Sequence, residues 1–110
     1  MKPPIKMLLI YVDETDLWHG QPLFEAIVRR VRQAGLAGAT AQHGMMGFGS
    51  HQQVHHKHLF GVSDDRPVVV SVVDTETKLR EVLPEVRAMV KEGLVVLLDA
   101  ERVALEGDAG

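Results

Sequence analysis

Two short apolar segments constrain the fold more than any other feature of this chain. Residues 5–12 read IKMLLIYV and residues 66–74 read RPVVVSVVD. The first is too short for a helix in a compact domain, and the second is β-branched almost throughout, so both are predicted to be strands. Because successive side chains of a strand point to opposite faces, apolar residues emerge on both faces of these strands. We therefore expect them in the middle of a sheet.

Between and after these strands the apolar pattern changes to the period of a helix. The spacing predicts a helix that begins at Pro22 and stops at Gly35, with a buried side made by Leu23, Phe24, Ile27, Val28, Val31 and Ala34. A second helix is predicted from Thr75 to Val90, with a kink or a restart at Pro84, because an interior proline deletes a hydrogen bond. Residues 37–46 and 94–105 predict two further strands, and residues 106–110 should fray.

The predicted order is β-α-β-β-α-β in a single domain, residues 1–110. This order is typical of a ferredoxin-like α+β sandwich, which has an antiparallel sheet of order 4-1-3-2 and two helices on one face. Its central strands are the first and third, which here are the two strands that are apolar on both faces. Each apolar side chain left in water on the second face would forfeit roughly 1.5–3 kcal/mol. We therefore expect a homo-oligomer in which another copy covers that face.

Composition excludes several classes of function. The chain has no cysteine, which rules out disulfides, thiolate nucleophiles and sulfur-based zinc sites. The formal net charge is -3, so no general attraction to nucleic acid is expected. Arg29, Arg30 and Arg32 form a basic ridge on the first helix, interpreted as a solvated face that Glu25 balances. The N-terminal apolar run is too short to span a bilayer, and we expect a cytoplasmic protein without membrane insertion.

A connection of nearly twenty residues, about 48–66, joins the second and third strands, where a hairpin normally needs two to five. Loops this long in compact domains are usually functional or disordered. The glycines at its root, Gly44, Gly47 and Gly49, permit close approach of a ligand to the backbone. Four histidines follow, and imidazole suits zinc, copper and nickel; they are His51, His55, His56 and His58. The alternative, a hydrated segment with incidental histidines, is the interpretation we favour.

A polar cluster, DETDLWHG, follows the first strand at residues 13–20. Asp13 and His19 could act as acid and base, as in a small hydrolase, with Trp18 as a stacking surface. The alternative is that the polar residues order the start of the first helix and that Trp18 is a packed anchor. We favour the second reading, because no serine lies in a motif that would make it a nucleophile.

Four stretches of the chain resemble, in the same order, the PII-like family catalogued as domain of unknown function 190. They read WHGQPLFEAIVRR, AGLAGATAQHGMMGFG, DRPVVVSVVD and LPEVRAMVKEGLVVLLDAERV, and the resemblance extends from about Lys6 to Leu105. The chain also looks related to the PII nitrogen-regulatory signalling proteins. In those proteins a Gly-Phe-Gly closes the second strand and opens the T-loop, a long mobile segment, and Gly47, Phe48 and Gly49 stand in that position here.

The resemblance implies a non-catalytic homotrimer whose sheets face inward. Clefts between its subunits would bind a small anionic effector, with an adenine nucleotide as the example from PII relatives. In this chain the residues carried over to that cleft are Gly47, Phe48, Gly49, Ser50, His51, Trp18, His19 and Lys91. Effector binding would let the loop regulate a partner protein, often a membrane transporter.

The chain departs from the PII pattern at two places. Ser50 and His51 stand where PII proteins carry an arginine and an effector-binding glutamine, and Lys91 is the only cation in the segment that replaces their glycine-lysine nucleotide loop. A second hypothesis is therefore kept. It is a metal-binding trimer, resembling the divalent-cation tolerance proteins, that would use the histidine-rich loop.

Overall fold

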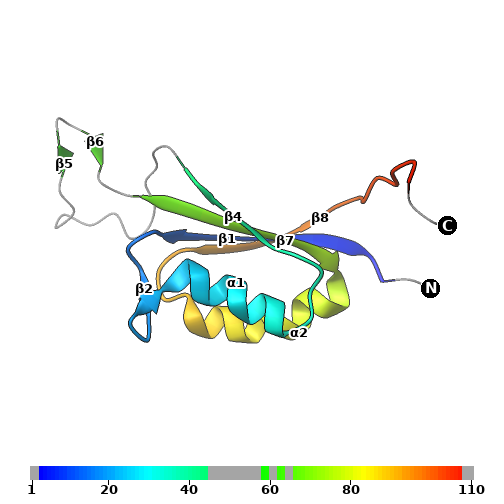
Figure 1. Ribbon diagram of the computed structural model, residues 1–110, viewed down its shortest axis with the longest axis horizontal. Helices are drawn as coiled ribbons and strands as arrows, with labels where there is room; N and C mark the ends of the chain where they lie inside the picture. The colour runs from blue at the N-terminus through cyan, green and yellow to red at the C-terminus, as the bar shows by residue number, and fades with distance from the viewer. Residues whose placement is uncertain (1–2, 45–57, 60–61, 64–65, 108–110) are drawn as a thin grey trace.

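Four strands form a single antiparallel sheet that organises the molecule (Figure 1). The structure is a computed structural model and describes residues 3–44, 58–59, 62–63 and 66–107. From edge to edge the strands are β4 (Thr40–His43), β7 (Pro67–Thr75), β1 (Ile5–Asp13) and β8 (Leu94–Asp99). The two strands predicted to be apolar on both faces, β1 and β7, therefore lie in the middle and pair with each other along their full length.

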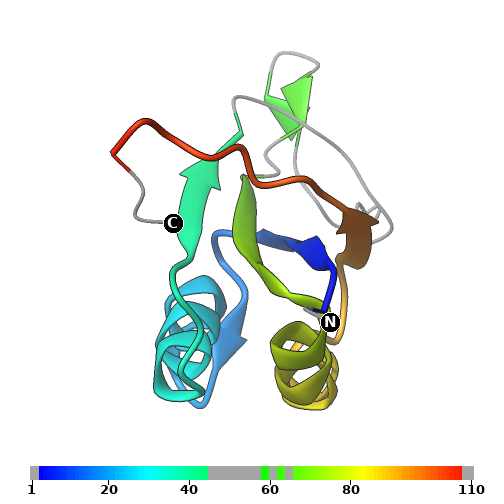
Figure 2. The same cartoon turned by 90° about the vertical axis from the view of Figure 1, so that its right-hand side faces the viewer.

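Two helices, α1 (Leu23–Gln33) and α2 (Glu76–Met89), pack side by side on one face of this sheet (Figure 2). The prediction of an α+β domain with a four-stranded antiparallel sheet and two helices is confirmed, and the arrangement is consistent with a ferredoxin-like fold. Among the described residues, neither helix is long and apolar enough to cross a membrane.

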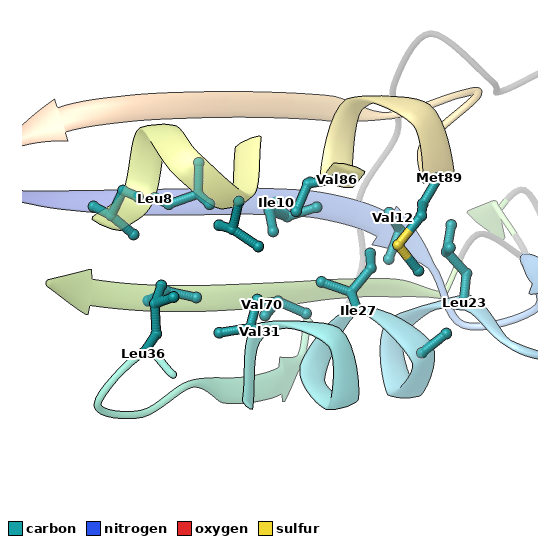
Figure 3. Close-up of a cluster of buried hydrophobic side chains, with 14 of the residues drawn as sticks. Leu8, Ile10, Val12, Leu23, Ile27, Val31, Leu36, Val70, Val86 and Met89 are labelled. Carbon is teal, nitrogen blue, oxygen red and sulfur yellow. The ribbon is translucent and has the colours of Figure 1, made fainter. Parts of the chain in front are cut away.

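The core lies between the sheet and the helices (Figure 3). Every second residue of β1 faces this core, and the same alternation on β7 follows from the register, which pairs Leu8 with Val72 and Ile10 with Val70. The fully buried side chains that strands and helices contribute are Leu8, Ile10, Val68, Val70, Val72, Ile27, Val31, Leu79, Val82 and Val86. Burial at this spacing explains both the strand period and the helix period in the sequence.

Two predicted strand boundaries and one predicted helix interruption need correction. The last strand ends at Asp99 rather than continuing to Leu105, because its partner β1 begins at Ile5 and the final backbone hydrogen bond, from Ala100 N to Ile5 O, lies there. The helix α2 runs through Pro84 without the restart that we considered. The second strand is shorter than predicted at its start, since β4 begins at Thr40.

Two small hairpins were not predicted. The first pairs β2 (Leu17–Trp18) with β3 (Gln21–Pro22), and the second pairs β5 (His58–Leu59) with β6 (Val62–Ser63) inside the long connection. The rest of the predicted loop from residue 48 to residue 65 lies outside the described residues, as do residues 108–110 of the predicted frayed tail.

Candidate functional site

A tight hairpin, β2–β3, carries two of the predicted ligand-binding residues. Trp18 pairs with Gln21, and the two residues between them both have positive φ, 50° at His19 and 79° at Gly20. This is the pattern of a two-residue turn of type I′, which matches the natural twist of antiparallel strands. Gly20 adopts the conformation without strain, and histidine is one of the few other residue types that visit it. A backbone hydrogen bond from Leu23 N to Asp16 O, 2.8 Å long, closes the hairpin at the start of α1.

The hairpin brings Trp18, His19 and Lys91 around one hollow of about 300 Å³. Lys91 is distant in the sequence from the neighbouring Trp18 and His19, and these three are the predicted ligand-binding residues that the structure describes. Lys91 follows the end of α2 and faces the hairpin from the connection to β8. The other residues that line the hollow are Asp16, Leu17, Leu23, Met89 and Glu92. The prediction that Trp18, His19 and Lys91 serve one site is therefore compatible with their positions.

The charges of this hollow limit what it can bind by itself. Lys91 supplies one positive charge, while Asp16 and Glu92 supply two negative charges. An anion placed against these residues alone would meet a surface of the same sign. A site for an anionic effector at this end of the molecule therefore needs further donors, from the long connection or from a second copy of the chain.

The Trp18 indole both packs and remains accessible. It lies against the hydrophobic core and is half-buried, and its ring contacts the His19 imidazole edge-on, with the centroids 4.4 Å apart. Edge-to-face pairs of this kind are favourable beyond the area they bury. The two readings of Trp18, packed anchor and stacking surface, are therefore compatible in this structure.

Both ends of the long connection are held against the end of β1. Gly44 N donates to Pro67 O over 2.8 Å, and Glu14 N donates to Arg66 O over 2.7 Å. The Glu14 carboxylate also pairs with His43 on β4 and lies 3.5 Å from the Arg66 guanidinium. A side chain at Gly44 would lie 2.8 Å from the Pro67 ring, which explains glycine at this root. The connection therefore leaves the sheet at the same end as the β2–β3 hairpin (Figure 1).

The Asp13 carboxylate has a structural role in this arrangement. It is only 3% exposed, and its Oδ1 accepts hydrogen bonds from the backbone and the hydroxyl of Thr15. Its Oδ2 accepts from Arg66 N over 3.1 Å, which ties the start of β7 to the end of β1. Hydrogen bonds of this kind order the turn after β1. The reading in which the polar residues order the start of the first helix needs correction, because no side chain of the described residues caps α1 and Asp13 instead orders the turn after β1.

Of the remaining predicted site residues, only His58 lies within the described part of the chain. Gly47, Phe48, Gly49, Ser50 and His51 lie outside the described residues, as do His55 and His56 of the alternative metal site. The fourth histidine, His58, belongs to β5. Within the part of the chain that the structure describes, no group of three or more histidine, aspartate or glutamate side chains could hold a metal ion.

Comparison with known proteins gives consistent matches along nearly the whole chain. Residues 5–102 match the model of DUF190, a family described as "Uncharacterized ACR". A UPF0166 protein of Aquifex aeolicus is 31% identical over 100 residues, which cover 91% of this chain and 94% of the relative. A UPF0166 protein of Methanocaldococcus jannaschii is 32% identical over 95 residues, which cover 86% of this chain and 87% of the relative.

Proposed function

Because this chain belongs to the DUF190 family, we propose that it is a cytoplasmic, non-catalytic regulatory protein of the PII-like kind. In this proposal three copies assemble through their sheets, and a small anionic effector, with an adenine nucleotide as the first candidate, binds in the clefts between them. The effector changes how the long connection, residues 48–66, contacts a partner protein such as a membrane transporter. The resemblance of the sequence to PII-like proteins motivates the proposal, and the surface of the sheet supports it.

The supporting observation is the apolar face of the sheet that the helices leave uncovered, which we call the open face. Its exposed members include Tyr11, which is 38% exposed, and Leu94, which is 56% exposed. The register places the other apolar side chains of this face beside them: Met7, Leu9, Val69, Val73, Val96 and Leu98. Contiguous apolar patches on all three long strands are typical of surfaces that bind another protein. Burying each such side chain stabilises an assembly by roughly 1.5–3 kcal/mol.

A second copy is the occupant that the proposal assigns to the open face. A closed assembly of identical copies removes the exposed patch from every copy at once. The polar residues that the register places on this face are Thr40 and Gln42 on the edge strand β4, Ser71 in the middle of β7, and Asp13 and Thr75 at the ends of β1 and β7. The patch is therefore mostly apolar on β1 and β8 and has a polar edge along β4, and polar edges are typical of protein interfaces.

Self-assembly would also complete the effector site. The hollow around Trp18, His19 and Lys91 carries too little positive charge for an anion in a single chain. In the assembly, backbone N–H groups near Gly49, the Ser50 hydroxyl and groups of a neighbouring copy supply the missing donors. Lys91 then serves as the cation that contacts the effector.

Thermal unfolding with ATP, ADP, AMP and cyclic dinucleotides tests the effector directly. A nucleotide that binds the folded protein adds about 2.7 kcal/mol of stability at a hundredfold excess over its Kd, and so raises the melting temperature. Lys91→Met and Gly49→Val should abolish the rise. Lys78→Met, which removes an exposed lysine from the first turn of α2, should leave it unchanged. No response to any nucleotide would contradict the nucleotide assignment.

The second candidate, metal binding by the histidine-rich loop, is favoured by the density of histidines between residues 51 and 58. Imidazole nitrogens are ordinary ligands of zinc and copper. Titration calorimetry with zinc and copper distinguishes it from the first proposal. Micromolar binding that is lost when His55, His56 and His58 are all replaced by alanine would support this candidate, and unchanged binding in that variant would contradict it.

A further inference from the structure

A second, larger hollow lies on the helix side of the molecule, away from the open face of the sheet. It has a volume of about 460 Å³, within the range of small-molecule sites, and it is bounded by the β2–β3 hairpin, α1 and α2. We call it the helix groove. Trp18, His19 and Met89 line it on one side and line the hollow near Lys91 on the other. The hairpin therefore separates the two hollows.

The helix groove combines an apolar surface with positive charge. Its apolar surface comes from the Trp18 indole and from the side chains of Ala26, Ala88 and Met89. Its charged residues are Arg29, Arg30 and Glu85, so the sum over these three groups is positive even with His19 neutral. A flat aromatic residue beside guanidinium groups is a combination that suits a planar ligand with a negative group.

The two arginines of the groove differ in how far their charges are already compensated. Arg30 forms an ion pair with Glu85 across the two helices, and this hydrogen bond raises the pKa of the guanidinium above its ordinary value. Arg29 instead donates a hydrogen bond to the neutral amide oxygen of Gln21 on the hairpin. The Glu25 carboxylate lies 3.9 Å from the Arg29 guanidinium, and this exposed pair on one helix contributes little to stability. Arg29 therefore keeps most of its positive charge and several N–H donors for a ligand.

We propose that the helix groove binds a small planar aromatic anion, an aryl carboxylate or an aryl phosphate. The ring lies against Trp18 and Met89, and the negative group accepts hydrogen bonds from the Arg29 guanidinium. Gln21 holds that guanidinium at the rim of the groove, and the positive-φ turn at His19 and Gly20 fixes the position of Gln21 relative to Trp18. This site is separate from the effector cleft proposed above and does not require assembly.

The only tryptophan of the chain, Trp18, lines this groove, so its fluorescence reports on the site. Benzoate and phenyl phosphate are the anionic probes, and benzamide is the neutral control of the same shape. Both anions should change Trp18 fluorescence along a saturation curve, and benzamide should bind about tenfold more weakly, because it lacks the charge-assisted hydrogen bond.

Two matched arginine variants locate the anion. Arg29→Gln should weaken benzoate binding about tenfold, because it removes the charged donor. Arg32→Gln should leave binding unchanged, because Arg32 lies on the same helix but lines a different hollow. Far-ultraviolet circular dichroism confirms that each variant is folded. Equal binding by Arg29→Gln and the unchanged protein would overturn the assignment, as would equal affinity for benzoate and benzamide.

NMR gives a second readout in case binding does not change the fluorescence. The indole N–H resonance of Trp18 should shift on addition of benzoate, and no shift together with no fluorescence change would overturn the proposal. Benzoate binding should also persist in Leu9→Glu, a variant of the open face. Binding that is lost with assembly would contradict a site within one chain, whereas failure of the nucleotide experiments would leave this result unaffected.

Discussion

The two faces of the sheet are made of similar side chains but have different surroundings. On β1, Leu8 and Ile10 are fully buried under the helices, while Leu9 and Tyr11, one position along, lie on the open face. The sequence IKMLLIYV does not distinguish them, since every position is apolar except Lys6. An apolar strand therefore predicts that both of its faces are covered, but it does not say what covers each face. Which face is covered by the chain itself depends on where the helices pack.

Among the variants that test the difference between the two faces, Leu9→Glu should have the largest effect, which is the loss of assembly. A carboxylate buried without a partner destabilises by roughly 3–5 kcal/mol, and each copy in an assembly would bring one. The variant should therefore be a folded monomer, since the helix-side core is untouched. Sedimentation velocity and circular dichroism measure both outcomes.

The control for this variant is Gln42→Glu, which adds the same charge at the polar edge of the open face on β4. It should assemble normally. If Leu9→Glu assembles as the unchanged protein does, the open face is not the interface.

Ile10→Ala should lower the free energy of unfolding by about 3 kcal/mol, because it removes a fully buried side chain and leaves a cavity. Leu9→Ala makes a similar deletion one residue away, on the open face. Because the proposed assembly buries the half-exposed Leu9 further, the loss of stability from Leu9→Ala should grow with protein concentration, whereas the loss from Ile10→Ala should not. Urea unfolding at several protein concentrations checks this. Identical concentration dependence in the two variants would contradict the distinction between the faces.

Asp74 lies near the end of β7, beside the helix-side core. Its replacement should change the stability by a smaller amount. Burial raises the pKa of this carboxyl, but hydrogen bonds from the backbone N–H groups of Ala37 and Thr75 outweigh it and leave the pKa below 3.8. Asp74→Asn should therefore lower stability by about 1 kcal/mol near neutral pH.

The sign of the pH dependence follows from the lowered pKa of Asp74. The stabilisation is complete above the ordinary pKa of an aspartate, and it is lost as the pH falls through the lower pKa of the folded state. Urea unfolding should therefore show that the free energies of unfolding of Asp74→Asn and of the unchanged protein become equal in acid. A difference that stays constant down to the lowest pH at which the protein folds would contradict this role.

The smallest effect is expected at the exposed pair of Lys6 and Asp99. Their hydrogen bond, followed by the charge of Lys6, holds the pKa of the Asp99 carboxyl below 3.8. Lys6→Met should return that pKa toward its ordinary value, which NMR titration of the Asp99 carboxyl measures. Stability should change little, because the Asp99 side chain is almost fully exposed. An unchanged pKa of Asp99 in the variant would show that the pair does not persist in solution.

Periodicity was sufficient to predict the two central strands and the two helices, because each of these elements buries one regularly spaced set of side chains. The structure confirms strands and helices at the predicted places, and the apolar stripe of α2 explains why Pro84 does not interrupt it. Leu79 and Val82 before the proline and Val86 and Met89 after it are all buried on the same side. Their packing outweighs the roughly 3 kcal/mol that an interior proline costs.

Other features depend on contacts that no local pattern encodes. The end of β8 at Asp99 is determined by the first residue of its partner β1, so the apolar residues beyond it, Val103 and Leu105, are exposed rather than part of the strand. The β2–β3 hairpin was missed because its turn is His-Gly rather than the usual Asn-Gly. The His-Gly turn was the sequence signal from which the hairpin could have been predicted. The hairpin in turn places Trp18 and Gln21 at the helix groove.

The candidate site also combines residues that the sequence identified with contacts that depend on the fold. Trp18, His19 and Lys91 were selected by resemblance, and the fold gathers them around one hollow. The charge of that hollow, with two carboxylates against one ammonium, could not be predicted, since Asp16 and Glu92 meet only after the hairpin and the end of α2 come together. Arg29 was interpreted as part of a solvated ridge, and its contact with Gln21 depends on the hairpin in the same way.

Sedimentation equilibrium of the unchanged protein at micromolar concentration tests the central claim most directly, which is that the open face is covered by identical copies. The account predicts a single species with three times the mass of the 12.1 kDa chain. A stable species with the mass of one chain would contradict it.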